Sequence, residues 1–299
     1  MKRALFIAGP TASGKSAFAL EVAGRRDAVI INADSMQVYR DLPVLTACPS
    51  SEEQASAPHR LYGFLDGAQA CSVAFWADKA MAEIESAWNA DKLPILAGGT
   101  GMYFKVLLDG IAKIPDIPDD IRASVRRDCL LEGSETLHRE LQGIDPEAAA
   151  RLAPGDSQRI SRAVEVFRAT GTPLSIWQQD TPPGPMAKLD RAGGVDKIAI
   201  IPERGTLYRR CDLRFDKMVE SGAIEEVEAL VARQLSPDLP IMRALGVPAL
   251  TAYLAGSVSL EAASADAKMQ TRRFAKRQLT WLRNQFSQWN NNFTQYMES

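Results

Sequence analysis

The sequence predicts an α/β fold in which a parallel sheet core is interrupted by a helical insertion and followed by a helical C-terminal region. Three observations predict it. Short apolar runs alternate with helical patterns over the first 113 residues, prolines then open a stretch without strand patterns, and one apolar run returns before the last helices. We expect the sheet core at 1–114 and 195–299, with the insertion at 115–194.

The composition is that of an ordinary globular chain and excludes several classes of protein. The 299 residues are 46% hydrophobic and 24% charged, which fits neither disorder nor a coiled coil. A formal net charge of -2 means that any nucleic-acid contact comes from a local patch. Four widely spaced cysteines and two histidines argue against a zinc site or a disulfide framework. No apolar stretch is long enough for a membrane span, and we expect a cytoplasmic monomer.

The elements of the first part of the chain follow one another as strand, helix, strand, helix and strand. Residues 3–8, with the apolar run at 4–8, predict a buried strand, and residues 14–24 then carry apolar side chains on one face at helical spacing. A β-branched run at 29–31 predicts the second strand, the repeat at 73–88 predicts another helix, and 93–97 predicts a third strand. Right-handed crossovers make these strands parallel, so active residues should gather at their carboxyl ends.

The insertion begins at a proline-bracketed hinge, Ile114–Pro118, and its pattern is helical. Two helix starts are predicted at Asp145–Pro146 and Thr172–Pro173, where the first residue caps and proline occupies the first turn. The run at 198–201 predicts the strand that returns to the sheet. Four apolar residues near the C-terminus recur at helical spacing and are expected in the core: Leu279, Leu282, Phe286 and Trp289.

A phosphate-binding motif lies between the first strand and the first helix. The segment Gly9, Pro10, Thr11, Ala12, Ser13, Gly14, Lys15 and Ser16 matches G-x-x-x-x-G-K-[ST], which predicts a P-loop NTPase-like core. In such a loop the backbone N–H groups surround phosphate oxygens, Lys15 neutralises charge, and Ser16 can hold Mg²⁺. The motif does not tell whether the phosphate is the group transferred or the group that leaves.

Two further strands end in residues that can carry chemistry. Asp34 follows the second strand and is either a general base or metal ligand, or a turn cap beside Ser35. Thr100 follows the third strand and is either a substrate contact or a helix cap. No apolar strand ends in Asp after residue 90, which disfavours motor-type NTP hydrolysis.

Taken together, five blocks of sequence resemble the ordered signature of the tRNA dimethylallyltransferase family. They are residues 9–16, 31–40, 98–103, 158–162 and 271–281, and they span nearly the whole chain. Two segments depart from the family pattern and remove a positive charge. Cys48 stands where the family commonly has Lys, and Ala244–Pro248 differs from its usual run.

The resemblance implies transfer of a dimethylallyl group from dimethylallyl diphosphate to N6 of adenosine 37, beside the anticodon. The tRNAs concerned read codons that begin with U, and the products are N6-(dimethylallyl)adenosine and diphosphate. It implies that Asp34 is the base for the weakly nucleophilic amine and that Thr100 contacts the target nucleotide. The cradle, with Lys15, Mg²⁺ on Ser16 and Arg214, would then stabilise the leaving diphosphate.

The resemblance also implies a set of residues that contact the tRNA anticodon loop, from which the target base must be turned out. Gln37 has the amide donor and acceptor to read an adenine edge. On residues alone, a solvated mixed surface is the default interpretation of the arginines of the insertion, and the resemblance reverses that weighting. The implied tRNA-contacting residues are Asp34, Ser35, Met36, Gln37, Thr100, Arg122, Gln158, Arg159, Ile160, Ser161 and Arg162.

Three rival functions remain open at this point. A P-loop kinase using ATP accounts for the motif at 9–16 but not for the other blocks. An enzyme that prenylates free adenine nucleotides has less need of an insertion, and a non-catalytic RNA-binding protein does not need Asp34 as a base. The donor that is consumed separates the first rival from the transferase.

Overall fold

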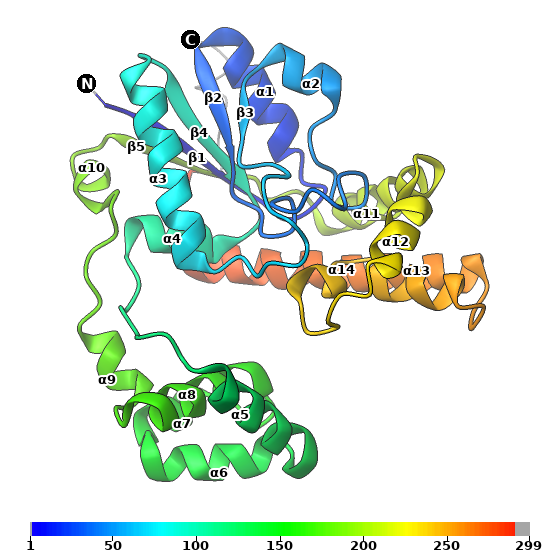
Figure 1. Cartoon of the computed structure of the whole chain (residues 1–299). Helices are drawn as coiled ribbons and strands as arrows, with labels where there is room; N and C mark the ends of the chain where they lie inside the picture. Colours follow the sequence, from blue (N-terminus) through cyan, green and yellow to red (C-terminus); the bar gives the residue numbers. More distant parts are fainter. Residues whose placement is uncertain (1, 291–299) are drawn as a thin grey trace. The chain divides into compact units, whose positions relative to one another are not determined.

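The computed structural model describes residues 2–290 (Figure 1). The chain divides into two compact units, one made of Met1–Leu108 and Pro185–Ser299 and the other of Asp109–Gly184. The helical unit therefore begins and ends earlier than the 115–194 expected from the sequence. Residues after Gly184 join the first unit because helix α10 (Ala187–Arg191) packs on the sheet and on helix α4 (Gly101–Leu108). The sheet core was expected to extend to residue 299, and residues 291–299 lie outside the described part of the chain.

A five-stranded parallel sheet forms the first unit, with the strand order β3-β2-β4-β1-β5. The expected parallel sheet is therefore confirmed. The fifth strand was expected to start at Ile198. It starts three residues earlier, at Val195, which pairs with Ala4. The two-residue β3 was not expected, since so short a run has no readable pattern. The strands are β1 (Ala4–Ala8), β2 (Ala28–Asn32), β3 (His59–Arg60), β4 (Leu93–Gly98) and β5 (Val195–Ala199).

Both faces of the sheet are covered by helices, because alternate side chains of each strand point in opposite directions. Leu5 and Ile7 of β1 pack in one apolar cluster with Phe18 of α1 (Lys15–Arg25). Phe6 of the same strand belongs to the cluster on the other face, with α3 (Val73–Asn89) and α4 (Gly101–Leu108). Figure 1 shows α1 and α3 on opposite sides of the strands.

Helices after β5 complete the first unit. The long α14 packs against α11, α13 and α4. Leu279 and Leu282 of this helix, with Phe286 and Trp289 just beyond its end, are all buried, which confirms the expected core positions. The remaining helices of this unit are α2 (Ser51–Ser56), α10 (Ala187–Arg191), α11 (Arg204–Glu220), α12 (Ala223–Ala232), η1 (Pro240–Arg243), α13 (Val247–Leu254) and α14 (Leu260–Gln285).

The outer edge of β5 is covered by the last described residue. Asn290 donates its backbone N–H to Lys197 O at 3.0 Å and accepts from Ala199 N at 3.0 Å. These two hydrogen bonds form an isolated parallel bridge beside Ile198. The end of the described chain therefore pairs with the strand that would otherwise close the sheet on this side.

The second unit is helical throughout and has its own apolar core. Asp145 caps α7 by accepting from Ala148 N at 3.0 Å, as expected. The second expected helix start is wrong in detail, because Pro173 itself occupies the cap position of α9 and no side chain caps it. The helices are α5 (Asp119–Glu132), α6 (Ser134–Ile144), α7 (Pro146–Arg151), α8 (Ser157–Thr170) and α9 (Leu174–Gln179), and their core includes Val125, Leu141, Ile160 and Val164.

Candidate active site

The three segments that the sequence singled out follow three neighbouring strands. Strand β4 lies between β1 and β2, and in a parallel sheet all three carboxyl ends meet at one edge. The loop 9–14 follows β1, Asp34 follows β2, and Thr100 follows β4. The sheet therefore brings the phosphate-binding motif, the candidate base and the candidate substrate contact to the same edge.

The loop after β1 has the curled backbone that a phosphate cradle needs. Ala12 and Gly14 have positive φ angles of 61° and 96°, so successive N–H groups turn toward one side. Gly9 has no room for a side chain, since an added Cβ would lie 2.5 Å from the Ser13 hydroxyl. That hydroxyl is buried and has no hydrogen-bond partner within residues 2–290. A pocket of about 440 Å³ opens over residues 12–17.

Three cations line this pocket, namely Lys15, Arg210 and Arg214. Lys15 is buried, and its ammonium donates to Pro10 O at 3.3 Å. Burial lowers the pKa of Lys15 to about 8, the nearby Asp34 carboxylate opposes this shift, and the positive charge of Arg214 adds to it. Burial likewise lowers the pKa of Arg214 from its ordinary value. Neither Lys15 nor Arg214 forms an ion pair within the described residues, so the pocket carries positive charge that a bound anion can neutralise.

The backbone of Asp34 is held by a buried asparagine. Asn32 accepts from Asp34 N at 2.7 Å and donates to Asp34 O at 2.9 Å, with a second donation to Leu61 O at 3.0 Å. The carboxylate Oδ1 of Asp34 accepts from Met36 N at 3.0 Å. An added Cβ on Gly99 would lie 3.3 Å from the other oxygen, Oδ2, so this oxygen faces the end of β4. Asp34 therefore has one oxygen fixed and one turned toward the neighbouring strand.

Thr100 is joined to the segment that begins with Asp34. Its hydroxyl oxygen accepts from Ser35 N at 2.9 Å, and the hydroxyl contacts the Ser35 Oγ at 3.2 Å. Its backbone N–H donates to Ala33 O at 3.1 Å. Only glycine fits at position 98, because a Cβ there would lie 1.9 Å from Ala33 O. The close approach of the two strand ends thus sets Thr100 beside Asp34.

The amide of Gln37 is already engaged within the protein. Its Nε2 donates to Thr46 O at 3.0 Å and to Ala47 O at 2.6 Å. The amide donor expected to read an adenine edge is thus used to hold the loop that carries Cys48. Gln37 and Cys48 line a second pocket of about 220 Å³, and Ser16 and Arg214 line both this pocket and the one over the cradle.

Cys48, the departure from the family pattern, is a neutral group in this structure. Its thiol lies 3.4 Å from the Thr46 hydroxyl and 3.6 Å from Gln37 O. Burial raises the pKa of Cys48 to about 11, so the thiol stays protonated near neutral pH. The lysine charge common in the family is therefore replaced here by an uncharged side chain.

The expected tRNA-contacting residues of the second unit lie on α8 and at the start of α5. Gln158 and Arg159 are exposed, Ser161 is half-buried, and half-buried Arg122 donates to Ile117 O at 3.1 Å. Ile160 is fully buried in the core of this unit, so its side chain cannot contact RNA.

The arginines of α8 are paired with acids of the same helix or its cap. Arg159 contacts Asp156 at 2.5 Å, and Arg162 contacts Glu165 at 3.6 Å. The side chains of Arg159 and Arg162 are 72% and 42% exposed, so solvent and ions reach both arginines. An exposed pair such as Arg159–Asp156 is weak, whereas the Glu165 carboxylate of the second pair is only 10% exposed.

Comparison with known proteins decides the family. A family model described as IPP transferase matches residues 37–285, which begin after the phosphate-binding loop. The chain belongs to this family. The family that the sequence resembles and the P-loop α/β class are thereby confirmed.

The relatives of this family member cover almost its whole length. A tRNA dimethylallyltransferase of Methylobacterium nodulans is 53% identical over 95% of this chain and 92% of the relative. Another from Parvibaculum lavamentivorans is 48% identical over 99% and 93%. The solved tRNA isopentenylpyrophosphate transferase of Bacillus halodurans has a TM-score of 0.68 at 34% identity, covering 100% and 94%. A eukaryotic dimethylallyltransferase acting on tRNA has a TM-score of 0.74 at 26% identity, covering 94% and 70%.

Two residues that position the site were missed in the sequence analysis. Asn32 holds Asp34, and Gln278 of α14 contacts both the phosphate loop and the segment before Thr100. Both lie in blocks that carry the family resemblance, which was the only feature of the sequence that could have singled them out as site residues. Their contacts depend on how distant segments meet, which no local pattern reveals.

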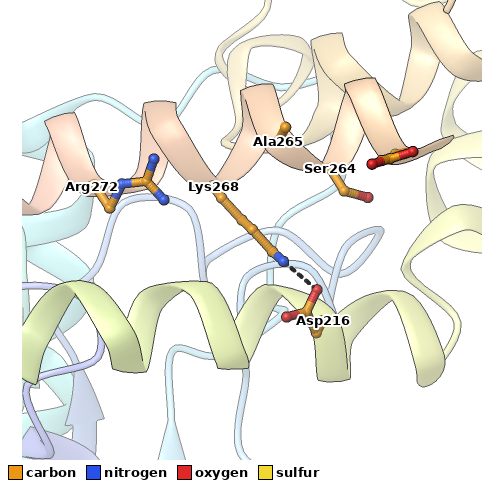
Figure 2. A pocket seen from close by; sticks show the side chains of 6 residues that line it. Asp216, Ser264, Ala265, Lys268 and Arg272 are labelled. Carbon is orange, nitrogen blue, oxygen red and sulfur yellow. Dashed lines mark ion pairs between the residues drawn. The ribbon is translucent and has the colours of Figure 1, made fainter. Parts of the chain in front are cut away.

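A pocket of about 460 Å³ between α11 and α14 holds none of the expected site residues (Figure 2). Figure 2 shows the Lys268 side chain pointing at Asp216, with which it forms an ion pair of 2.5 Å. Arg272 pairs with Asp212 at 2.6 Å. Because both cations are neutralised within the protein, this pocket lacks the unpaired positive charge found in the pocket over residues 12–17. No helix within residues 2–290 is both long and apolar enough to cross a bilayer.

Proposed function

We propose that this chain transfers a dimethylallyl group from dimethylallyl diphosphate to N6 of adenosine 37 in tRNAs that read codons beginning with U. The products are N6-(dimethylallyl)adenosine and diphosphate. The names of its close relatives support the reaction class. The observation that carries the proposal is the pairing of a cationic phosphate cradle after β1 with a carboxylate after β2, at one edge of the sheet.

On the donor side, the protein stabilises the group that leaves. The N–H groups of the loop at 9–14, with the side chains of Lys15 and Arg214, surround the diphosphate as the allylic carbon–oxygen bond breaks. The buried and unpartnered Ser13 hydroxyl is a further donor for a phosphate oxygen. Lys15 and Arg214, which form no ion pair within the described residues, suit a leaving group whose negative charge increases in the transition state.

The residues at the cradle also fit Mg²⁺. Within the described residues, no three His, Cys, Asp or Glu side chains gather to hold a metal, so the protein offers no dedicated cage. Mg²⁺ in phosphate sites commonly takes one or two protein ligands and completes its shell with phosphate oxygens and water. The exposed Ser16 hydroxyl is placed to be that ligand, since it lines both pockets. When bound, the ion would supply charge neutralisation for the leaving diphosphate.

On the acceptor side, Asp34 and Thr100 act on the adenosine. The N6 amine forms a bond to the allylic carbon, and the proton it loses passes to the Asp34 carboxylate. The second oxygen, Oδ2, is the one available for that proton, since Oδ1 is held by Met36. Thr100, fixed by Ser35, contacts the nucleotide. The exposed surface of α8 and Arg122 hold the anticodon stem-loop.

A donor competition tests the proposal. Purified protein, Mg²⁺ and unmodified tRNA are incubated with dimethylallyl diphosphate or with ATP, and the digested nucleosides are analysed by mass spectrometry. We expect adenosine heavier by one dimethylallyl group with the first donor and unchanged nucleosides with the second. Phosphoryl transfer from ATP to a small acceptor, with tRNA unmodified under both conditions, would establish the kinase instead. Free AMP as acceptor separates tRNA modification from nucleotide prenylation.

A further inference from the structure

One side chain of α14 reaches the centre of the candidate site. Gln278 is only 8% exposed, and both ends of its amide are used. Its Oε1 accepts from Thr11 N at 2.9 Å, and its Nε2 donates to Gly99 O at 3.0 Å. Thr11 belongs to the phosphate cradle, and Gly99 immediately precedes Thr100. A single amide therefore connects the donor side of the site to the acceptor side.

Gln278 connects the loops that follow β1 and β4, beyond the end of the sheet. Strands β1 and β4 are neighbours, and their ladder closes with Gly9 N donating to Gly98 O at 3.3 Å. Within residues 2–290, the hydrogen bonds that join the two loops beyond this pair both run through Gln278. The spacing between Thr11 and Gly99 therefore depends on this side chain.

The orientation of the amide is fixed by its partners. The Thr11 N–H can only donate and the Gly99 carbonyl can only accept, so one rotamer of the amide satisfies both and its flipped form satisfies neither. A carboxylate would retain the first bond and set two acceptors against each other at the second. A hydrocarbon would lose both bonds. Glutamine is thus the side chain whose length and polarity match this position.

Gln278 and Trp281 pack so closely against the segment 98–101 that two of its glycines have no room for a side chain. An added Cβ on Gly99 would lie 2.4 Å from Gln278 Nε2, and one on Gly101 would lie 1.8 Å from the ring of Trp281. Gln278 and Trp281 are one helical turn apart on α14, so both face the segment 98–101. The same face of one helix thus packs along the loop that carries Thr100.

We propose that Gln278 is a positioning residue that sets the spacing between the diphosphate cradle and Thr100, and this inference rests on the proposed function. The reacting carbon and the N6 nitrogen must approach to about 3–3.5 Å, and a misplacement of about 1 Å can cost on the order of 100-fold in rate. Donor and acceptor bind to opposite ends of the Gln278 bridge. Its loss should therefore slow the chemical step more than it weakens either ligand.

The first test compares Gln278→Leu with Gln270→Leu, a matched control on the same helix whose amide contacts Asp266. Three quantities are measured: the single-turnover rate of tRNA prenylation, the affinity for inorganic pyrophosphate, and the affinity for tRNA. We expect Gln278→Leu to lower the rate about 10- to 100-fold while both affinities stay within about threefold. Gln270→Leu should leave all three quantities unchanged.

The second test displaces Gln278 without mutating it. Gly99→Ala places a methyl group against the flexible end of the glutamine, so we expect a similar loss of rate with a small change in unfolding temperature. The same methyl would lie 3.3 Å from an Asp34 oxygen, and the double variant Gly99→Ala/Gln278→Leu distinguishes the two causes. If Gly99→Ala acts through Gln278, the double variant is no slower than Gln278→Leu alone.

The outcomes separate this inference from the proposed function. If the wild-type protein does not prenylate tRNA, both fail. If it does, and folded Gln278→Leu keeps its rate within threefold, this inference alone fails. A loss of rate accompanied by an equal loss of pyrophosphate affinity also overturns it, since the glutamine would then serve only the cradle. Should Gln278→Leu not fold, Gly99→Ala and Gln278→Glu decide, and a wild-type rate in Gly99→Ala is contrary to the inference.

Discussion

The cations of the two units differ in what surrounds them, and the difference indicates how each would bind an anion. In the sheet unit, Lys15 and Arg214 form the cradle cations, which lack a carboxylate at ion-pair distance within the described residues. In the helical unit, Arg159 and Arg162 each contact an acid and remain exposed. The cradle cations carry an unbalanced charge in a confined pocket, whereas the exposed arginines exchange one anion for another. Specific, tight binding belongs to the first arrangement and salt-sensitive binding to the second.

The largest expected effect comes from the carboxylate beside the cradle cations. Asp34→Asn keeps an oxygen for the Met36 N–H but cannot accept the amine proton. We expect the single-turnover rate of prenylation to fall by about 10²–10⁴-fold, with tRNA affinity within about threefold. The control is Asp27→Asn, an exposed acid that pairs with Lys92. An unchanged rate in Asp34→Asn would remove this residue from the chemistry.

The cradle cations predict a pH dependence. Because the pKa of Lys15 is lowered to about 8, its ammonium loses its proton as the pH rises through 8. Pyrophosphate affinity, measured by calorimetry, should therefore fall above this pH. The reference is Lys15→Met, in which only the pyrophosphate itself still titrates. Relative to this variant, the wild-type affinity should fall by up to about tenfold per pH unit. The same shift predicts that the donor-free protein gains stability between pH 8 and 10.5, where only the unfolded chain keeps this proton. Equal pH profiles for both proteins would contradict the assignment.

The exposed arginines predict a smaller effect that depends on salt. Arg159→Ala and Arg162→Ala should each weaken tRNA binding several-fold and reduce the slope of log affinity against log salt by about one. Filter binding at several salt concentrations measures both quantities. Arg151→Ala is the control, because Arg151 pairs with Glu147 at 3.6 Å in the same unit. If the slope is the same for all four proteins, the arginines of α8 do not contact phosphate.

The smallest effect concerns Ile160, which stands between those arginines in sequence. Its side chain is buried, so Ile160→Val should lower the free energy of unfolding by about 0.5–1.5 kcal/mol. The salt slope of tRNA binding should not change. Denaturant unfolding and the same filter-binding series distinguish this packing role from an RNA contact. A changed slope with unchanged stability would reverse the assignment.

The sequence was sufficient for features that follow from local pattern. Strand runs ending in Gly9, Asp34 and Thr100 predicted one shared edge, because the carboxyl ends of parallel strands converge. The sequence was insufficient where distant segments meet. Gln37 looked free to contact a base, yet the loop that folds back over it supplies the carbonyls of Thr46 and Ala47. The role of Gln278 could not be predicted from local sequence, because its hydrogen-bond partners lie more than 170 residues away.

The bridge between Asn290 and β5 has a consequence for handling the protein. An outer strand with open N–H and C=O groups is a template onto which another chain can add. Here Asn290 satisfies groups of Lys197 and Ala199 on that strand. Shortened versions that stop before Asn290 would leave these groups free, and such versions should self-associate at concentrations where the longer chain stays dispersed.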